Sequence, residues 1–481
     1  MSSNQELAKS PTGIQGLDEI TNGGFPKGRP TLICGGAGSG KTLLAASFLL
    51  NGVVQYDEPG VLMTFEETSE ELASDLNSLG YDLGKLIAEG KLVVDYVRVE
   101  RSEIEETGEY DLEGLFVRLE YAVNSIGAKR IVLDTIESLF AGLSNPGILR
   151  AELRRLFRWL KDKGLTAVLT GERGDAGLTR QGLEEYVSDA VILLDHRVHE
   201  QVSTRRLRIV KYRGSHHGTN EYPFLIDAEG LSVLPVTSLG LTHPALNERV
   251  STGVARLDDM FSGRGYYRGS TILLSGTAGT GKTSLAAHFV DAACRRGERC
   301  LYFLFEESPQ QLLRNMDSID INLQQWVDRG LLQFHADRPS RFGLETHLAS
   351  MQRAVRKFEP LVTVTDPVTN LLTVGNQSDV RSMLTRVIDY LKSESITGVF
   401  TSLTPGSKEL EETDAGVSSL MDTWIVLTIN EENRKRRRWL SVLKSRGMAH
   451  SNSVSEYLLT DHGLQVLDEA PAGVAHVGIG G

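Results

Sequence analysis

Two glycine-rich segments of this 481-residue chain have the residue types and the spacing of a phosphate-binding loop. Residues 35–42 read GGAGSGKT and residues 276–283 read GTAGTGKT, and both fit the pattern G-x-x-x-x-G-K-[ST]. In this pattern the glycines let backbone N–H groups face phosphate oxygens, the lysine reaches the terminal phosphates, and the final hydroxyl can bind Mg²⁺. We therefore expect nucleotide contacts from Gly36, Gly38, Ser39, Gly40, Lys41, Thr42 and Leu43, and from Thr277, Gly279, Thr280, Gly281, Lys282, Thr283 and Ser284.

The flanking residues indicate which elements would position these loops. The apolar runs 31–34 and 271–274 predict buried strands that enter the loops. The runs 43–48 and 285–289 predict helices that leave them, so that a helix N-terminus faces the bound anion. Strand, loop and helix in this order predict an α/β fold, with a mostly parallel central sheet flanked by helices.

The similarity between the two halves extends beyond the loops. Residues 12–14 (TGI) recur as 252–254 (TGV), and residues 65–67 (FEE) recur as 305–307. This internal repeat of about 240 residues predicts two tandem domains, 1–245 and 246–467, each of ordinary domain size. The join is expected near the proline-containing segment 241–244, and the Gly- and Ala-rich segment 468–481 is expected to be a flexible tail.

Composition narrows the class of protein. The formal net charge is −12, and no apolar run reaches the length of a membrane span. The first residues lack a basic segment followed by an apolar core, so no secretory signal is expected. Cys34, Cys294 and Cys300 have neither metal-site spacing nor a disulfide framework, and Cys34 is expected in a core strand. We expect a cytoplasmic protein without a membrane partner.

Two further strand-like runs each end in an aspartate. Residues 130–134 (RIVLD) end in Asp134, and residues 361–366 (LVTVTD) end in Asp366. Nucleotide hydrolysis needs a carboxylate for the metal, so these aspartates, with Thr42 and Thr283, form the predicted Mg²⁺ sites. The alternative is that each aspartate caps the helix that follows it.

Both copies carry two adjacent glutamates after another strand-like run, Glu66 and Glu67 in the first copy and Glu306 and Glu307 in the second. The carboxyl ends of parallel strands line the ligand crevice, and neighbouring carboxylates repel each other, which raises one pKa and favours a catalytic base. Either glutamate of each pair could be that base. The alternative is that the pair favours a helix start.

A third shared motif is Lys-x-Arg-Gly after a strand, with Lys211 and Arg213 in the first copy and Lys444 and Arg446 in the second. Cations at a strand end are suited to contact a nucleotide, including one held by a neighbouring subunit. A solvated hairpin is the alternative.

These motifs together resemble the KaiC family of circadian-clock proteins, within the RecA-like ATPases. The resemblance covers residues 11–467 and rests on the two phosphate loops, the two Glu-Glu pairs, the two Walker B aspartates and the two Lys-x-Arg-Gly segments. It implies two tandem RecA-like P-loop domains, ATP and Mg²⁺ bound between subunits, and a double-ringed homohexamer. It also implies a first domain that hydrolyses ATP, a second domain that phosphorylates and dephosphorylates its own residues, and a KaiB-like protein partner.

Ser418 and Ser419 match the family's phosphorylated pair, which is Ser-Thr in the family. Aligning the two copies places these serines opposite Glu185 and Tyr186, so the second copy alone has two hydroxyls there. Two serines can also precede a strand for ordinary turn reasons. The glycine-rich end of the chain is unlike a helical docking peptide, which predicts a member outside the timekeeping type, in circadian or stress and signalling control.

Two other functions are compatible with the motifs. A RecA-like DNA-dependent ATPase is suggested by the basic run 434–438 (RKRRR), which also fits a charged hairpin turn; the acidic balance of the chain argues against nucleic acid. A nucleotide-gated hexameric scaffold would bind ATP without phosphorylating itself. Mapping the modified residues after incubation with ATP distinguishes a scaffold from a kinase.

Overall fold

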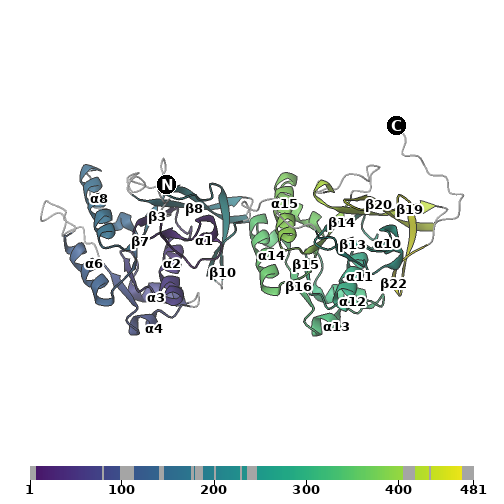
Figure 1. Cartoon of the computed structure of the whole chain (residues 1–481), viewed down its shortest axis with the longest axis horizontal. Coiled ribbons are helices and arrows are strands. Elements are labelled where there is room, and N and C mark those ends of the chain that lie inside the picture. Colours follow the sequence, from purple (N-terminus) through teal and green to yellow (C-terminus); the bar gives the residue numbers. More distant parts are fainter. Residues whose placement is uncertain are drawn as a thin grey trace, which may run out of the picture. The chain divides into compact units, whose positions relative to one another are not determined.

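The computed structural model describes residues 7–77, 81–97, 113–139, 146–174, 178, 188–199, 202–227, 230–235, 246–404, 418–432 and 435–467. The chain divides into two compact units, Met1–Ser238 and Leu239–Gly481 (Figure 1). Residues 241–245, where the expected domain boundary falls, and the expected tail 468–481 lie outside the described residues.

The first unit is built on a nine-stranded sheet with the strand order β11-β10-β9-β8-β3-β7-β6-β4-β5. The strands from β8 to β5 in this order pair in parallel, and β8, β9, β10 and β11 pair antiparallel. The elements of this unit are β1 (Lys9–Ser10), α1 (Leu17–Ile20), β2 (Phe25–Pro26), β3 (Pro30–Gly35), α2 (Lys41–Tyr56), β4 (Gly60–Thr64), α3 (Ser69–Asn77), α4 (Leu83–Ala88), β5 (Leu92–Tyr96), α6 (Glu113–Ile126), β6 (Arg130–Asp134), α7 (Ile136–Leu139), α8 (Pro146–Asp162), β7 (Thr166–Glu172), β8 (Ala190–His199), β9 (Val202–Tyr212), β10 (Glu221–Asp227) and β11 (Gly230–Val233).

The second unit repeats this sheet, with the order β16-β15-β17-β18-β14-β19-β20-β21-β22 and the same change from parallel to antiparallel pairing after β19. The α/β prediction is therefore confirmed for both halves. The elements are β12 (Arg249–Val250), α10 (Ala255–Met260), β13 (Tyr266–Tyr267), β14 (Thr271–Gly276), α11 (Lys282–Arg295), β15 (Cys300–Leu304), α12 (Pro309–Asp317), α13 (Gln324–Asp328), β16 (Leu332–Ala336), η2 (Pro339–Arg341), α14 (Leu344–Phe358), β17 (Val362–Asp366), η3 (Val368–Thr373), α15 (Gln377–Ser393), β18 (Thr397–Leu403), η4 (Ser418–Leu420), β19 (Thr423–Glu432), β20 (Lys435–Ser445), β21 (Ser455–Thr460) and β22 (Gly463–Val466).

Alternate residues of the central strands supply two hydrophobic cores in the first unit. Ile33 and Val132 face the core that includes α2, whereas Leu32, Cys34 and Ile131 face the core that includes α6 and α8. Helices therefore cover both faces of the sheet, as Figure 1 shows. Cys34 is fully buried in β3, which confirms the prediction that it lies in a core strand.

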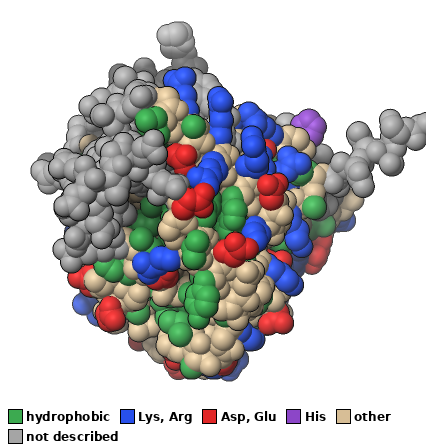
Figure 2. Space-filling model, turned by 90° about the vertical axis from the view of Figure 1, so that its left-hand side faces the viewer, with side chains coloured by type: hydrophobic (Ala, Val, Ile, Leu, Met, Phe, Trp, Pro, Cys, Tyr) green, Lys and Arg blue, Asp and Glu red, His purple; other side chains and the backbone are tan. Residues whose placement is uncertain are grey.

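Helix α8 shows how a surface helix is fixed to this sheet. It buries Leu149, Leu153 and Leu156 at helical spacing and exposes Arg150 and Arg154 on its opposite side. Figure 2 shows lysine and arginine side chains gathered on the face of the first unit that is turned to the viewer. Among the described helices, none is long and apolar enough to span a bilayer.

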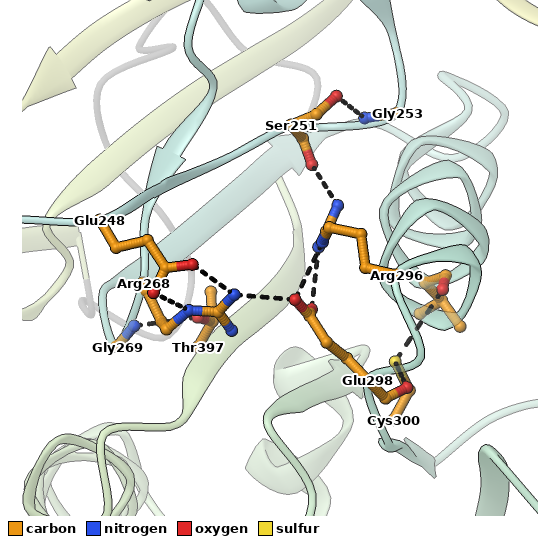
Figure 3. Close-up of polar contacts among 10 residues, drawn as sticks. Glu248, Ser251, Gly253, Arg268, Gly269, Arg296, Glu298, Cys300 and Thr397 are labelled. Carbon is orange, nitrogen blue, oxygen red and sulfur yellow. Dashed lines mark hydrogen bonds and ion pairs between the residues drawn. The ribbon is translucent and has the colours of Figure 1, made fainter.

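A buried glutamate, Glu298, lies just before β15 and is neutralised by two arginines (Figure 3). Glu298 is 6% exposed, and its Oε1 lies 2.8 Å from Arg268 Nη2 and 2.9 Å from Arg296 Nε. In the first unit, Glu58 lies two residues before β4, as Glu298 lies two residues before β15. Glu58 pairs instead with the fully buried Arg130, whose Nε is 2.6 Å from Glu58 Oε2. The two copies therefore balance an acid at the same strand position with arginines from different places in the sequence.

Candidate active sites

Both glycine-rich loops lie between a central strand and a long helix, as their flanking residues predict. The first loop joins β3 to α2, and the second joins β14 to α11. Gly40 and Gly281, the last residues before the helices, have φ of 97° and 87°, a region that favours glycine. A Cβ on Gly40 would lie 2.8 Å from Ile226 Cδ1, and one on Gly281 would lie 2.9 Å from Leu459 Cδ2, so both loops are also closely packed.

The loop lysines fold back onto backbone carbonyls. Lys41 Nζ lies 3.0 Å from the carbonyl oxygen of Gly36, and Lys282 Nζ lies 2.9 Å from that of Gly276 and 2.8 Å from that of Thr277. Lys282 is 7% exposed, and burial lowers its pKa to about 8. The other predicted contact residues lie in the loops or in the first helical turns: Gly38, Ser39, Thr42, Leu43, Gly279, Thr280, Thr283 and Ser284.

The two predicted metal-site aspartates are the last residues of β6 and β17, at the same sheet edge as the loops. Asp134 accepts a hydrogen bond from the Thr170 hydroxyl and another from Thr42 of the first loop. Burial raises the pKa of Asp134, and these two hydroxyls oppose that rise. In the second unit, Asp366 Oδ1 accepts from the hydroxyl of Thr401.

The donor chemistry at this edge fits Mg²⁺. Thr42 and Asp134 in the first unit, and Thr283 and Asp366 in the second, would hold the ion with hydroxyl and carboxylate oxygens. Across the described residues there is no group of three or more His, Cys, Asp or Glu side chains that could enclose a metal.

The glutamate pairs follow β4 and β15 and reach the same edge, because Thr64 pairs with Asp134 and Leu304 with Asp366. Glu66 Oε1 accepts hydrogen bonds from Thr135 Oγ1 at 2.8 Å and from Ser138 Oγ at 2.7 Å. Its role is therefore partly structural.

Burial and nearby negative charges act on the second glutamate of each pair, Glu67 and Glu307. Burial, with the negative charge of Asp134 next in size, raises the pKa of Glu67. Burial, followed by the charges of Asp366 and Glu306, raises the pKa of Glu307. A raised pKa makes a carboxylate a stronger base, so these shifts favour Glu67 and Glu307 as the proton acceptors.

The Lys-x-Arg-Gly motifs lie at the opposite, amino edge of each sheet. Lys211 and Lys444 are still within β9 and β20, so the expectation that the motif follows the strand is wrong for the lysines. The reason is that β9 and β20 stay paired with β8 and β19 up to the first residues of those partner strands. The backbone N–H of Arg213 donates to the carbonyl oxygen of Asp189, just before β8, at 2.9 Å. The backbone N–H of Arg446 donates to that of Asp422, just before β19, at 2.8 Å.

Ser418 and Ser419 also lie at the amino edge, in the short helix η4. Lys444 Nζ is 3.0 Å from the carbonyl oxygen of Ser418, Arg446 Nη2 is 2.8 Å from that of Ser419, and Arg381 Nη2 is 3.3 Å from Ser419 Oγ. The Ser419 side chain is exposed. The residues aligned with these serines in the first copy, 185 and 186, lie outside the described residues.

These serines are remote from the phosphate loop of their own unit. The N–H of Asp422 bonds the carbonyl oxygen of Thr271, the first residue of β14, whereas the loop starts after Gly276, the last residue of that strand. Five residue steps along a parallel strand separate the two edges by about 16 Å.

The basic run 434–438 forms mainly a strand and not the expected turn. Lys435 to Arg438 pair with Glu432 to Ile429 in the β19–β20 ladder, and Arg437 Nη1 lies 3.6 Å from Glu456 Oε2. Residues 433 and 434, between the two strands, lie outside the described residues.

Several polar side chains around these sites are absent from the sequence prediction. They are Thr170 and Thr401 against the aspartates, Thr135 and Ser138 against Glu66, Arg381 against Ser419, and Tyr302 against Asp366. Each lies outside the motif whose residue it contacts, so a motif search cannot find it. The signal that was available is the alignment of the two copies, which places Thr170 and Thr401 at equivalent points of β7 and β18.

A family model described as "ATPase: KaiC" matches residues 10–238 and again residues 250–471, which together are most of the chain. The chain belongs to the KaiC family. The two nine-stranded sheets are its tandem RecA-like domains, as predicted. Membership implies nucleotide binding and ATPase activity, which agrees with the two phosphate loops described above.

Individual relatives of the KaiC family support the same assignment. "Circadian clock protein KaiC2" of Synechocystis sp. is 59% identical over 464 residues, covering 96% of this chain and 82% of the relative. "Circadian clock oscillator protein KaiC" of Parathermosynechococcus lividus is 38% identical over 467 residues, covering 96% and 86%. The protein of the same name from Synechococcus elongatus is 37% identical over 472 residues, covering 97% and 90%.

Proposed function

We propose that this KaiC-family protein is both an ATPase and a serine autokinase. The first domain hydrolyses ATP, and the second transfers the terminal phosphoryl group of ATP to Ser418 and Ser419 of an adjacent copy and reverses that transfer. The copies form a double-ringed homohexamer in the cytoplasm that acts in circadian or stress and signalling control, with a KaiB-like protein as partner.

The observation that carries the proposal is the placement of acceptor and loop at opposite sheet edges. The serines and their own phosphate loop are separated by the length of β14, about 16 Å, which is far beyond the contact distance that phosphoryl transfer needs. Transfer to these serines therefore requires the loop of a second copy, and a closed ring supplies one to every subunit.

The cations beside the serines support this arrangement. Lys444 and Arg446 already hold the backbone carbonyls of Ser418 and Ser419. A neighbouring copy's triphosphate brought to these hydroxyls would meet the same two cations, which would stabilise the charge on the transferring group. In the first domain, Lys211 and Arg213 would serve a neighbouring nucleotide in the same way.

In the transfer to serine, Glu307 of the copy that holds the ATP accepts the hydroxyl proton of the acceptor serine. The hydroxyl oxygen of the acceptor serine forms a bond to the terminal phosphorus as the bond to the bridging oxygen breaks, ADP leaves, and the carboxylate takes the hydroxyl proton. The raised pKa of Glu307 suits that step. Glu67 would orient and deprotonate water in the first domain, where Glu66 is held by two hydroxyls. Mg²⁺, when bound, would neutralise charge on the phosphates.

Mixing two variants tests transfer between copies. One variant carries Lys282→Ala with intact serines, and the other carries Ser418→Ala and Ser419→Ala with an intact loop. Neither alone should become phosphorylated, whereas the mixture, after subunit exchange with ATP, should carry phosphate on the Lys282→Ala chains. Mass spectrometry of chains distinguished by an isotope label reports this. Phosphate that appears elsewhere, or ATP hydrolysis without phosphate at either serine, would remove the kinase assignment.

A further inference from the structure

Asp366 of the second domain has a buried phenol as a hydrogen-bond partner. Tyr302 Oη donates to Asp366 Oδ2 at 2.9 Å, while Thr401 Oγ1 donates to Asp366 Oδ1. Tyr302 is completely buried, and its ring packs against Phe334 with 5.9 Å between the ring centroids. Each carboxylate oxygen of Asp366 therefore has its own hydroxyl donor, and both donors come from neighbouring strands of the sheet.

The first domain has a leucine at the equivalent place. Tyr302 pairs with Val364, two residues before the register pair of Leu304 with Asp366. Leu62 pairs with Val132, two residues before the pair of Thr64 with Asp134. The strand position is thus the same in both copies, but the side chain in the first domain has no donor.

The phenol removes orientational freedom from a carboxylate that the site needs in one geometry. Asp366 is almost entirely buried, so water is a poor substitute for a lost donor there. Hydrogen bonds to a ligating carboxylate fix its direction and sustain its affinity for the ion. The rigid ring of Tyr302, held by the core, is suited to that task.

We infer that Tyr302 is a positioning residue that holds Asp366 in the orientation for a divalent cation, and that this support belongs to the second domain alone. The inference rests on the proposed Mg²⁺-dependent phosphoryl transfer, because it assigns Asp366 to the metal. The two domains then depend differently on divalent cation, and the difference comes from one residue in equivalent strands.

Direct Mn²⁺ binding to the full chain tests this. In a Lys41→Ala background the second loop keeps its lysine and the first does not, so nucleotide-dependent binding reports the second domain. Free Mn²⁺ is measured by electron paramagnetic resonance in the presence of a saturating non-hydrolysable ATP analogue. Tyr302→Phe removes a single oxygen atom and should weaken Mn²⁺ binding by about ten-fold. In a Lys282→Ala background, which reports the first domain, the same substitution should leave Mn²⁺ binding unchanged.

Tyr266→Phe is the matched control. Tyr266 is 2% exposed in the same hydrophobic core, and its ring packs against Phe261 and Phe289, away from Asp366. It should leave Mn²⁺ affinity unchanged whatever it does to the melting temperature. Equal weakening by both substitutions, or a Tyr302→Phe affinity within about two-fold of the parent, overturns the inference.

The outcomes also separate this inference from the proposed function. A selective effect of Tyr302→Phe in a protein that never phosphorylates its serines supports the positioning role and removes the kinase. Absence of nucleotide-dependent Mn²⁺ binding in the parent chain overturns both.

Discussion

The charge of Lys282 changes within a pH range that a binding experiment can reach. Burial lowers its pKa to about 8, while the unperturbed value is about 10.4. At pH 9 about nine-tenths of this lysine is therefore uncharged in the free protein, and at pH 7 about a tenth. A bound triphosphate beside the ammonium group favours the charged form, so binding at pH 9 takes up close to one proton.

The sign and size of the effect follow from this linkage. Because binding must first recharge the lysine, nucleotide affinity of the second site should be about ten-fold weaker at pH 9 than at pH 7. Titration calorimetry of the full-length Lys41→Ala chain with a non-hydrolysable ATP analogue measures the affinity. Two buffers with different ionisation enthalpies measure the proton uptake.

Lys282→Arg is the control for this prediction, because a guanidinium stays charged throughout this pH range. Any pH dependence that remains in Lys282→Arg belongs to the nucleotide or to other groups and is subtracted. Equal affinities of the parent at pH 7 and pH 9 after that subtraction, with no proton uptake, would show that the loop lysine is not desolvated as the structure has it.

Three other perturbations have defined outcomes. Glu58→Gln leaves the buried Arg130 without its counter-charge, so we expect about 3–5 kcal/mol of destabilisation and a calorimetric transition of the first domain lowered by roughly 6–20 °C; an unchanged transition would refute the buried ion pair. Burial lowers the pKa of His288, so the unfolded chain binds the proton more tightly and the stability of the protein should fall on acidification below about pH 6.5. In His288→Gln the melting temperature should change less with pH in that range. A melting temperature that falls with pH as steeply in His288→Gln as in the parent would count against this prediction. Gly281→Ala should weaken nucleotide binding to the second domain more than Gly279→Ala. Both glycines have left-handed φ, but a Cβ at 281 would meet a neighbouring leucine, whereas a Cβ at 279 would meet open space. Equal affinities of the two variants would refute this interpretation of the loop.

The phosphate loops and their flanking elements could be predicted because all the residues of each motif are consecutive in the sequence. The motif in residues 276–283 fixes the backbone that surrounds a phosphate, and the apolar runs beside it have only one reasonable interpretation. The aspartates could be predicted for a similar reason, since Asp134 ends an apolar run that must be a central strand. Internal duplication strengthened each of these predictions.

Features that depend on strand register could not be predicted in this way. Whether the Tyr302 hydroxyl reaches Asp366 depends on which strand lies beside β15, and the run that contains Tyr302 is apolar on both sides. The distance between Ser418 and its own loop depends on the direction of β19 relative to β14. The hydroxyls that bond to Glu66 come from Thr135, directly after β6, and from Ser138 in α7, and no local pattern links either residue to β4.

The arginines that neutralise Glu58 and Glu298 limit how the two halves can be recombined. Gly60 pairs with Arg130 at the first position of β6, whereas Cys300 pairs with Val362 at the first position of β17. A chimera in which the front segment of the first half replaces that of the second would therefore place Glu58 beside a strand that has Val362 where the first half has Arg130. An exchange of segments between the two halves therefore has to move each glutamate together with its own arginines.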